Sequence, residues 1–119
     1  MDLVGVYGSL RKGLSNHFLL ENSEYLGQVK TPPEWSLYDL GAFPALVPAG
    51  KTAVVVEVYR VTPETLVALD QLEDYPEWYQ RQRLPTPYGD CWIYYHPQQT
   101  NEHLTLVPDG DWMAYYQGR

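Results

Sequence analysis

Cysteine is almost missing from this sequence. Cys91 is the single cysteine, so no disulfide can form within the chain. The fold must therefore rest on a hydrophobic core, which a chain of 119 residues is long enough to bury. The scarcity of cysteine is also compatible with a reducing compartment, and we expect a cytoplasmic protein.

Basic residues and long apolar runs are also scarce. Lys and Arg number 8 against 15 Asp and Glu, which gives a formal net charge of −7. This balance and the lack of any Lys/Arg run argue against a nucleic-acid partner, because phosphate binding needs a basic surface. No stretch approaches the ~20 apolar residues of a membrane span, and the first residues lack a signal-peptide pattern. We expect no membrane partner.

Motifs for phosphates and metals are missing too. Neither GxxxxGK[ST] nor GxGxxG occurs in the chain. The three histidines, His17, His96 and His103, have no metal-ligand spacing, and we interpret them as surface or structural residues. We expect no cofactor and no metal.

Tyrosine and tryptophan are abundant, with 11 and 4 copies. Such residues suit half-buried strand surfaces and the walls of pockets. A protein-facing aromatic patch, in a structural or interaction protein, is the alternative explanation.

The apolar pattern predicts one α+β domain over residues 1–119. Near-continuous valine in 53–61 is typical of an interior strand covered on both faces. Thr62, Pro63 and Glu64 form a strong helix start. We expect strands at 3–7, 25–29, 34–40, 53–61, 79–84 and 91–95, a turn at 85–90, helices at 15–22 (capped by Ser15) and 63–73, and a last helix beginning near 110–112. The sheet should be curved or barrel-like, with two or three short helices packed outside it.

Glu73 conflicts with the pattern of its own helix. Leu66, Leu69 and Glu73 lie at i, i+3 and i+7, so the glutamate shares the stripe that faces the core. Burial and the negative end of the helix both raise the pKa of a carboxyl group, which suits a general acid/base near neutrality. The alternative is that the helix end frays and Glu73 bends into solvent.

Tyr79 and Arg81 follow Glu73 and are two residues apart, so they share one face of the expected strand. They could orient a carboxylate substrate or lock Glu73 in place. A cross-strand aromatic beside a surface arginine is an equal alternative. Asp70 lies near the same helical stripe and is expected to be a partner or boundary residue.

A glycine-rich corner follows the first strand. Gly8 permits a close backbone approach or a positive φ, and the main-chain N–H groups of Gly8, Ser9 and Leu10 could form a cradle for a small anion, helped by the Ser9 hydroxyl. A Gly-Ser turn alone is weak support for a site. We expect Arg11 and Lys12 to be solvated.

Several segments together resemble the gamma-glutamylcyclotransferase superfamily, and most of all its gamma-glutamylamine cyclotransferase branch and small bacterial relatives. The resemblance spans most of the chain, and its specific part is the combination of a YGSL corner with an LDxLE…YxR segment. The matching segments are 6–13 (VYGSLRKG), 16–17 (NH), 57–59 (EVY), 69–73 (LDQLE), 79–81 (YQR), 86–89 (TPYG) and 110–112 (GDW).

The resemblance implies a mixed barrel of five or six strands with peripheral helices. It also implies that Glu73 is the catalytic acid/base and that a substrate cavity is lined by Tyr7, Gly8, Ser9 and Leu10, with Tyr79 nearby and Asn16 and Arg81 as supporting residues. Many relatives have glycine at the position of Val56, so we expect a narrower cavity here.

The activity implied by the resemblance is gamma-glutamyl(amine) cyclotransferase. In that reaction the α-amine of a gamma-glutamyl substrate attacks the substrate's own γ-carbonyl, giving 5-oxoproline and a free amine. The partner would be this small molecule, and the protein a monomer or weak dimer. The alternative is a non-catalytic module that binds a gamma-glutamyl-like or other anionic metabolite.

Overall fold

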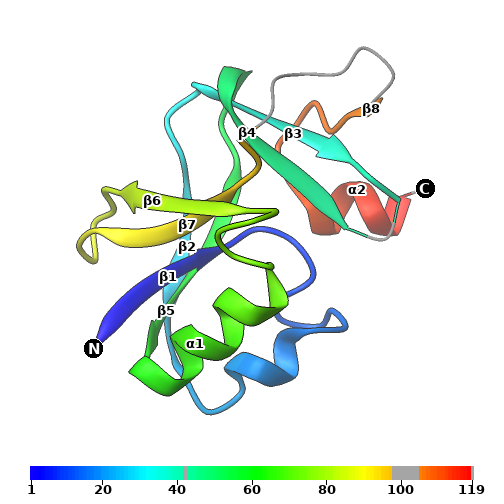
Figure 1. Ribbon diagram of the computed structural model, residues 1–119. Coiled ribbons are helices and arrows are strands. Elements are labelled where there is room, and N and C mark those ends of the chain that lie inside the picture. Colours follow the sequence, from blue (N-terminus) through cyan, green and yellow to red (C-terminus); the bar gives the residue numbers. More distant parts are fainter. Residues whose placement is uncertain (42, 98–104, 119) are drawn as a thin grey trace.

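The first strand, β1 (Asp2–Val6), lies in the middle of a five-stranded mixed sheet of order β2-β5-β1-β7-β6 (Figure 1). It pairs antiparallel with β5 and parallel with β7. The computed structural model describes residues 1–41, 43–97 and 105–118, so His103 lies outside the described residues. The other four strands of this sheet are β2 (Glu24–Lys30), β5 (Val55–Val61), β6 (Gln80–Leu84) and β7 (Cys91–Tyr95).

A smaller sheet of order β4-β3-β8 completes the α+β fold. It consists of β3 (Trp35–Asp39), β4 (Pro44–Thr52) and β8 (Thr105–Leu106). The His96 N–H donates to the Leu46 carbonyl at 2.7 Å, which joins the end of β7 to β4. Tyr88, between β6 and β7, packs on Gly27 of β2 at the opposite edge, so the large sheet curls round. The predicted fold class is confirmed, and the two sheets together form the curved architecture.

The two α-helices lie apart from each other, one below the large sheet and the other beside the small sheet (Figure 1). α1 (Pro63–Leu72) begins as predicted, because the Thr62 side chain accepts a hydrogen bond from the Thr65 N–H at 3.1 Å. α2 (Trp112–Gly118) begins where the Gly-Asp-Trp segment predicts. In the described part of the chain, no helix has the length and apolarity needed to cross a membrane.

The helix predicted at 15–22 is shorter than expected. It is a single 3₁₀ turn, η1 (His17–Leu20), and Ser15 does not cap it. Asn16 stands at the capping position without a side-chain cap, because its amide donates to the Ser9 hydroxyl oxygen at 2.8 Å. The polar side chain that could have extended the helix stabilises the corner after β1 instead.

Two hydrophobic clusters hold the elements together. One joins the two sheets to Trp112 of α2, and the other joins the large sheet to α1 and η1. Most of β5 is buried, as its valines predict. Val56 belongs to the first cluster and packs against Gly5, where an added Cβ would lie 2.6 Å from Val56 Cγ1.

Arg11 is the main error of the sequence prediction, because only 4% of it is exposed. Its Nε donates to Glu57 of β5 at 2.9 Å and its Nη1 to Asp111 at 2.7 Å, before α2. Glu57 also accepts the Lys12 N–H and the Tyr59 hydroxyl, each at 2.9 Å. This buried cluster fixes the outer side of the corner to the sheet.

Candidate active site

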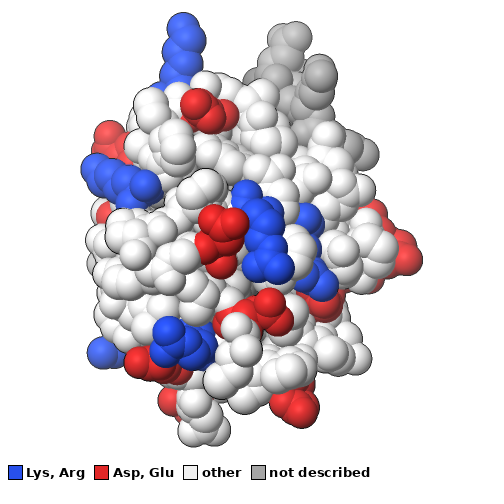
Figure 2. Space-filling view, turned by 90° about the vertical axis from the view of Figure 1, so that its left-hand side faces the viewer, with Lys and Arg blue, Asp and Glu red and all other residues white. Residues whose placement is uncertain are grey.

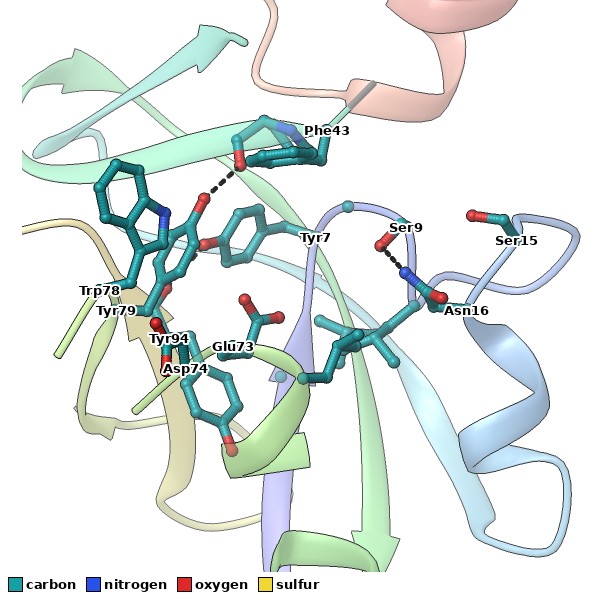
Figure 3. Close-up of a pocket in the computed structure, with 16 residues that line it drawn as sticks. Tyr7, Ser9, Ser15, Asn16, Phe43, Glu73, Asp74, Trp78, Tyr79 and Tyr94 are labelled. Atoms are coloured by element: carbon teal, nitrogen blue, oxygen red, sulfur yellow. Dashed lines mark hydrogen bonds between the residues drawn. The ribbon is translucent and has the colours of Figure 1, made fainter. Parts of the chain in front are cut away.

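One cavity of about 400 Å³ opens between the end of α1 and the corner after β1 (Figure 3). This volume is within the usual range of small-molecule sites. Of the predicted site residues, all except Arg81 line it: Tyr7, Gly8, Ser9, Leu10, Asn16, Glu73 and Tyr79. Val56 is not among the lining residues and lies behind Gly5, which is one of them.

Glu73 is the C-cap of α1, directly after the buried face formed by Leu66 and Leu69. Its N–H donates to the Leu69 carbonyl at 3.0 Å, so the last turn is closed and the helix does not fray before Glu73. The Glu73 side chain points into the cavity toward the Tyr7 ring (Figure 3). No hydrogen bond or ion pair to its carboxyl group is present among the described residues. Burial raises the pKa of Glu73 to about 7, with no compensating partner.

Two tyrosine hydroxyls near Glu73 donate their hydrogen bonds to main-chain carbonyl groups and not to the Glu73 carboxyl. Tyr7 donates its hydroxyl hydrogen to the Tyr94 carbonyl at 2.8 Å, and Tyr79 donates to the Pro44 carbonyl at 3.0 Å. Burial, followed by the neighbouring Tyr79 and Glu73, raises the pKa of Tyr7 well above its usual value. The pKa of Tyr79 is also raised, by burial and then Glu73. Both phenols therefore stay neutral near pH 7, where the Glu73 carboxyl changes its charge.

The corner residues Gly8 to Leu10 form the opposite wall. Their main-chain N–H groups donate to no acceptor among the described residues. The backbone is held by other bonds: the Arg11 N–H donates to the Gly8 carbonyl, and the Asn16 N–H to the Ser9 carbonyl, both at 2.9 Å. Fixed N–H groups without internal acceptors can bind an anion.

Gly8 is required for close approach, and its φ is not positive. A Cβ on Gly8 would lie 2.8 Å from both Cγ and Cδ of Pro44. We expect Gly8→Ala to lower the free energy of unfolding by about 1–3 kcal/mol and to weaken ligand binding, because the corner must move away from β4. Urea unfolding and calorimetric titration measure the two effects.

The matched test adds Pro44→Ala to the Gly8→Ala variant, which removes both clashing atoms. We expect this double variant to regain part of the lost stability. If the stability losses of the two single substitutions simply added in the double variant, the steric explanation would be wrong.

Arg81 lies outside the cavity, so it is not placed to hold a substrate. It pairs with Asp70, which was expected to be a partner or boundary residue. Nine further lining residues were not predicted from the sequence as site residues. These are Gly5, Val6, Ser15, Phe43, Pro44, Leu72, Asp74, Trp78 and Tyr94.

Two of the missed residues had no usable sequence signal. Phe43 directly precedes β4, and Pro44 is its first residue. This strand was not predicted, because its sequence PALVPAGKT contains two prolines and a glycine. Trp78 had a usable sequence signal, because it directly precedes Tyr79 and aromatic residues suit pocket walls. Phe43, Trp78 and Leu72 are each more than 40% exposed, and they form an apolar rim at the cavity.

Comparison with known proteins agrees with this geometry. The family model described as "Gamma-glutamyl cyclotransferase, AIG2-like" matches residues 4–114. A Vibrio cholerae protein with the provisional name gamma-glutamylcyclotransferase is 51% identical over 110 residues, covering 92% of this chain and 94% of that protein. A Danio rerio protein named gamma-glutamylaminecyclotransferase B is 37% identical over 90 residues, covering 68% of this chain and 47% of that protein.

Solved structures show the same fold. The solution structure of Escherichia coli ytfP is 38% identical, has a TM-score of 0.76 and covers 96% of this chain and 98% of its own. The crystal structure of a Mus musculus AIG2-like protein is 28% identical and has a TM-score of 0.79. The match covers 94% of this chain and 88% of that protein. The chain therefore belongs to the gamma-glutamyl cyclotransferase, AIG2-like family.

Proposed function

We propose that this protein converts a gamma-glutamyl amine into 5-oxoproline and a free amine. The observation that supports this most is the Glu73 carboxyl, which faces a cavity and has no hydrogen-bond or ion-pair partner among the described residues. The opposite wall is formed by Gly8 to Leu10, whose main-chain N–H groups donate to no acceptor in the described part of the chain. The name of the Danio rerio relative supports an amine as the leaving group.

The reaction closes a five-membered ring. The substrate's α-nitrogen forms a bond to its γ-carbonyl carbon, and the bond from that carbon to the leaving nitrogen breaks. No water is consumed. A cavity that holds the curled glutamyl unit supplies much of the acceleration, because well-oriented intramolecular reactions reach effective molarities of roughly 10⁵ M or more.

Glu73 relays the protons. The α-ammonium loses two protons as it becomes the lactam N–H, and the leaving nitrogen gains two as it departs and becomes an ammonium ion. A carboxyl group with a pKa of about 7 can accept and return a proton at neutral pH.

The N–H groups of Gly8 to Leu10 bind negative oxygen. The substrate has two such groups, its α-carboxylate and the carbonyl oxygen that becomes negative during ring closure. An oxyanion donor of this kind contributes on the order of 3 kcal/mol in acyl-transfer sites. A ligand-bound structure distinguishes the two roles.

Product identity tests the proposed function. The protein is incubated with a panel of gamma-glutamyl amines, and the products are identified by mass. We expect 5-oxoproline and an equal amount of amine, with no reaction of substrates whose α-nitrogen is acetylated. Release of glutamate would show hydrolysis, and binding without turnover would show a binding module; either result contradicts the proposal.

The pH dependence provides a further prediction. Because the ionised Glu73 accepts the first proton, kcat/KM should fall at acid pH with a midpoint near 7, the raised pKa of this carboxyl group. Stopped assays with a fixed gamma-glutamyl amine measure this profile. A midpoint at the ordinary glutamate pKa would contradict the raised pKa of Glu73, and a profile with no fall at acid pH would mean that Glu73 is not the base.

A further inference from the structure

A charged pair, Asp70 and Arg81, lies outside the cavity that Glu73 faces, and it contacts Tyr94 of the cavity wall. Asp70 Oδ1 accepts the Tyr94 hydroxyl at 2.6 Å, and Asp70 Oδ2 accepts Arg81 Nη2 at 3.2 Å. Arg81 Nε lies 3.1 Å from Asp70 Oδ1 but is not aligned for a hydrogen bond, so that contact is ionic. The side chains of Arg81 and Asp70 are only 15% and 20% exposed.

Aromatic rings hold the Arg81 guanidinium on the side of the molecule that carries the β6–β7 hairpin. Its central carbon lies 4.6 Å from the centre of the Tyr75 ring and 4.3 Å from that of Trp92. On this face, basic side chains lie among acidic ones (Figure 2). The rings restrict a cation that already has a carboxylate partner, so the position of Arg81 is well defined.

The same residues fix the chain on both sides of Glu73. Asp70 lies three residues before it on α1, and Tyr75 lies two residues after it. The Tyr75 N–H donates to the Asp70 carbonyl at 2.9 Å, and the Tyr75 ring contacts Arg81. The helix end that directs Glu73 into the cavity is therefore tied to β6 and β7.

Asp70 is also close enough to affect the charge of Glu73. Residues at i and i+3 of a helix have Cβ atoms about 5–6 Å apart. An unpaired Asp70 carboxylate would repel an ionised Glu73, and Arg81 supplies the compensating charge. The ionisable groups around Glu73 are the neutral phenols Tyr7, Tyr79 and Tyr94, the adjacent Asp74 on the cavity wall, and the Asp70–Arg81 pair.

We propose that Arg81 is a positioning residue that acts on Glu73 through Asp70. It neutralises the carboxylate one turn before Glu73 and holds the end of α1 against the sheet. Its role in ring closure rests on the proposed function, whereas its effect on the Glu73 charge does not. Burial is the one resolved cause of the raised Glu73 pKa.

The test titrates Glu73 directly, by carboxyl ¹³C NMR, with the Glu73→Gln variant identifying its resonance. Arg81→Met leaves Asp70 uncompensated and should raise the Glu73 pKa by about 1. Asp70→Asn leaves Arg81 uncompensated and should lower it by a similar amount. Arg81→Lys keeps the charge, so its Glu73 pKa should stay near that of the parent. The Glu73 pKa of the Arg81→Met/Asp70→Asn double variant should also stay near the parent value.

Arg83 provides the matched control. Its guanidinium carbon lies 3.9 Å from the centre of the same Trp92 ring, but it makes no ion pair with Asp70 in the described structure. Arg83→Met should therefore leave the Glu73 pKa unchanged.

Opposite shifts in Arg81→Met and Asp70→Asn would support the proposal, because a purely structural role gives no such sign reversal. Shifts in the same direction, or none, would overturn it. If Arg81→Met fails to fold, Asp70→Asn decides the test by itself. A Glu73 pKa that is not lowered in Asp70→Asn would then overturn the proposal. If the parent forms no lactam, the proposed function fails, and the titration still decides the role of Arg81.

Discussion

Replacing Glu73 by Gln is expected to lower kcat for 5-oxoproline formation by about 10²–10⁴-fold, the usual contribution of a general acid/base. Gln has nearly the same shape but cannot accept the proton of the α-ammonium. Ligand binding should persist, because the N–H groups of Gly8 to Leu10 are untouched. Lactam assays and calorimetric titration with 5-oxoproline measure the two effects.

The same variant should become more stable at neutral and alkaline pH. Burial raises the Glu73 pKa from 4.5 to about 7, so ionisation of this group destabilises the fold increasingly as pH rises between these values. Gln carries no charge, so Glu73→Gln should gain about 1–3 kcal/mol over the parent above the folded-state pKa. Urea unfolding at several pH values measures this gain.

A gain in stability with a loss of activity separates a catalytic role from misfolding. Glu77→Gln is the matched control, because Glu77 is exposed in the following segment and does not line the cavity. It should leave kcat within a factor of two or so of the parent, as expected for a surface change. Full activity in Glu73→Gln would exclude the proposed acid/base role.

Replacing Arg11 by Ala is expected to lower the free energy of unfolding by about 3–5 kcal/mol, because it leaves a buried charge without its partner. Glu57 is 5% exposed and would lose the guanidinium 2.9 Å away. Asp111 would lose its ion-pair partner as well. The corner should also lose its fixed geometry, so lactam formation should fall together with stability. Denaturant unfolding and lactam assays measure both.

Lys12→Ala is the control for Arg11→Ala. The Lys12 side chain is exposed, and only its main-chain N–H bonds Glu57. Its removal should change stability by no more than about 0.5 kcal/mol. Equal effects of the two substitutions would contradict the role given to the buried cluster.

The Glu73 site could be predicted because its signal is local. The eight residues from Leu66 to Glu73 contain the whole pattern, in which two leucines and a carboxyl residue share one face of a helix. The structure keeps that arrangement. The corner at Gly8 was predicted for a similar reason, since glycine directly after a strand permits a close approach. There the approach is to Pro44, which the sequence did not identify.

The burial of Arg11 could not be predicted, because its partners are distant in the chain. Glu57 lies 46 residues away and Asp111 lies 100 away, so no local pattern links them. An isolated arginine in a polar corner is normally solvated, and here tertiary contacts override that preference. The strand β4 was missed because its prolines and glycine indicate a loop when considered alone.

In the proposed site, the Glu73 carboxyl and the main-chain N–H groups of Gly8 to Leu10 hold one glutamyl unit between them. A crystal structure with bound 5-oxoproline would show these contacts. We expect the lactam nitrogen beside the Glu73 carboxyl and a ligand oxygen on the N–H groups of Gly8 to Leu10. A ligand that occupied another part of the surface, or that lay in the cavity without touching Glu73, would contradict this proposal.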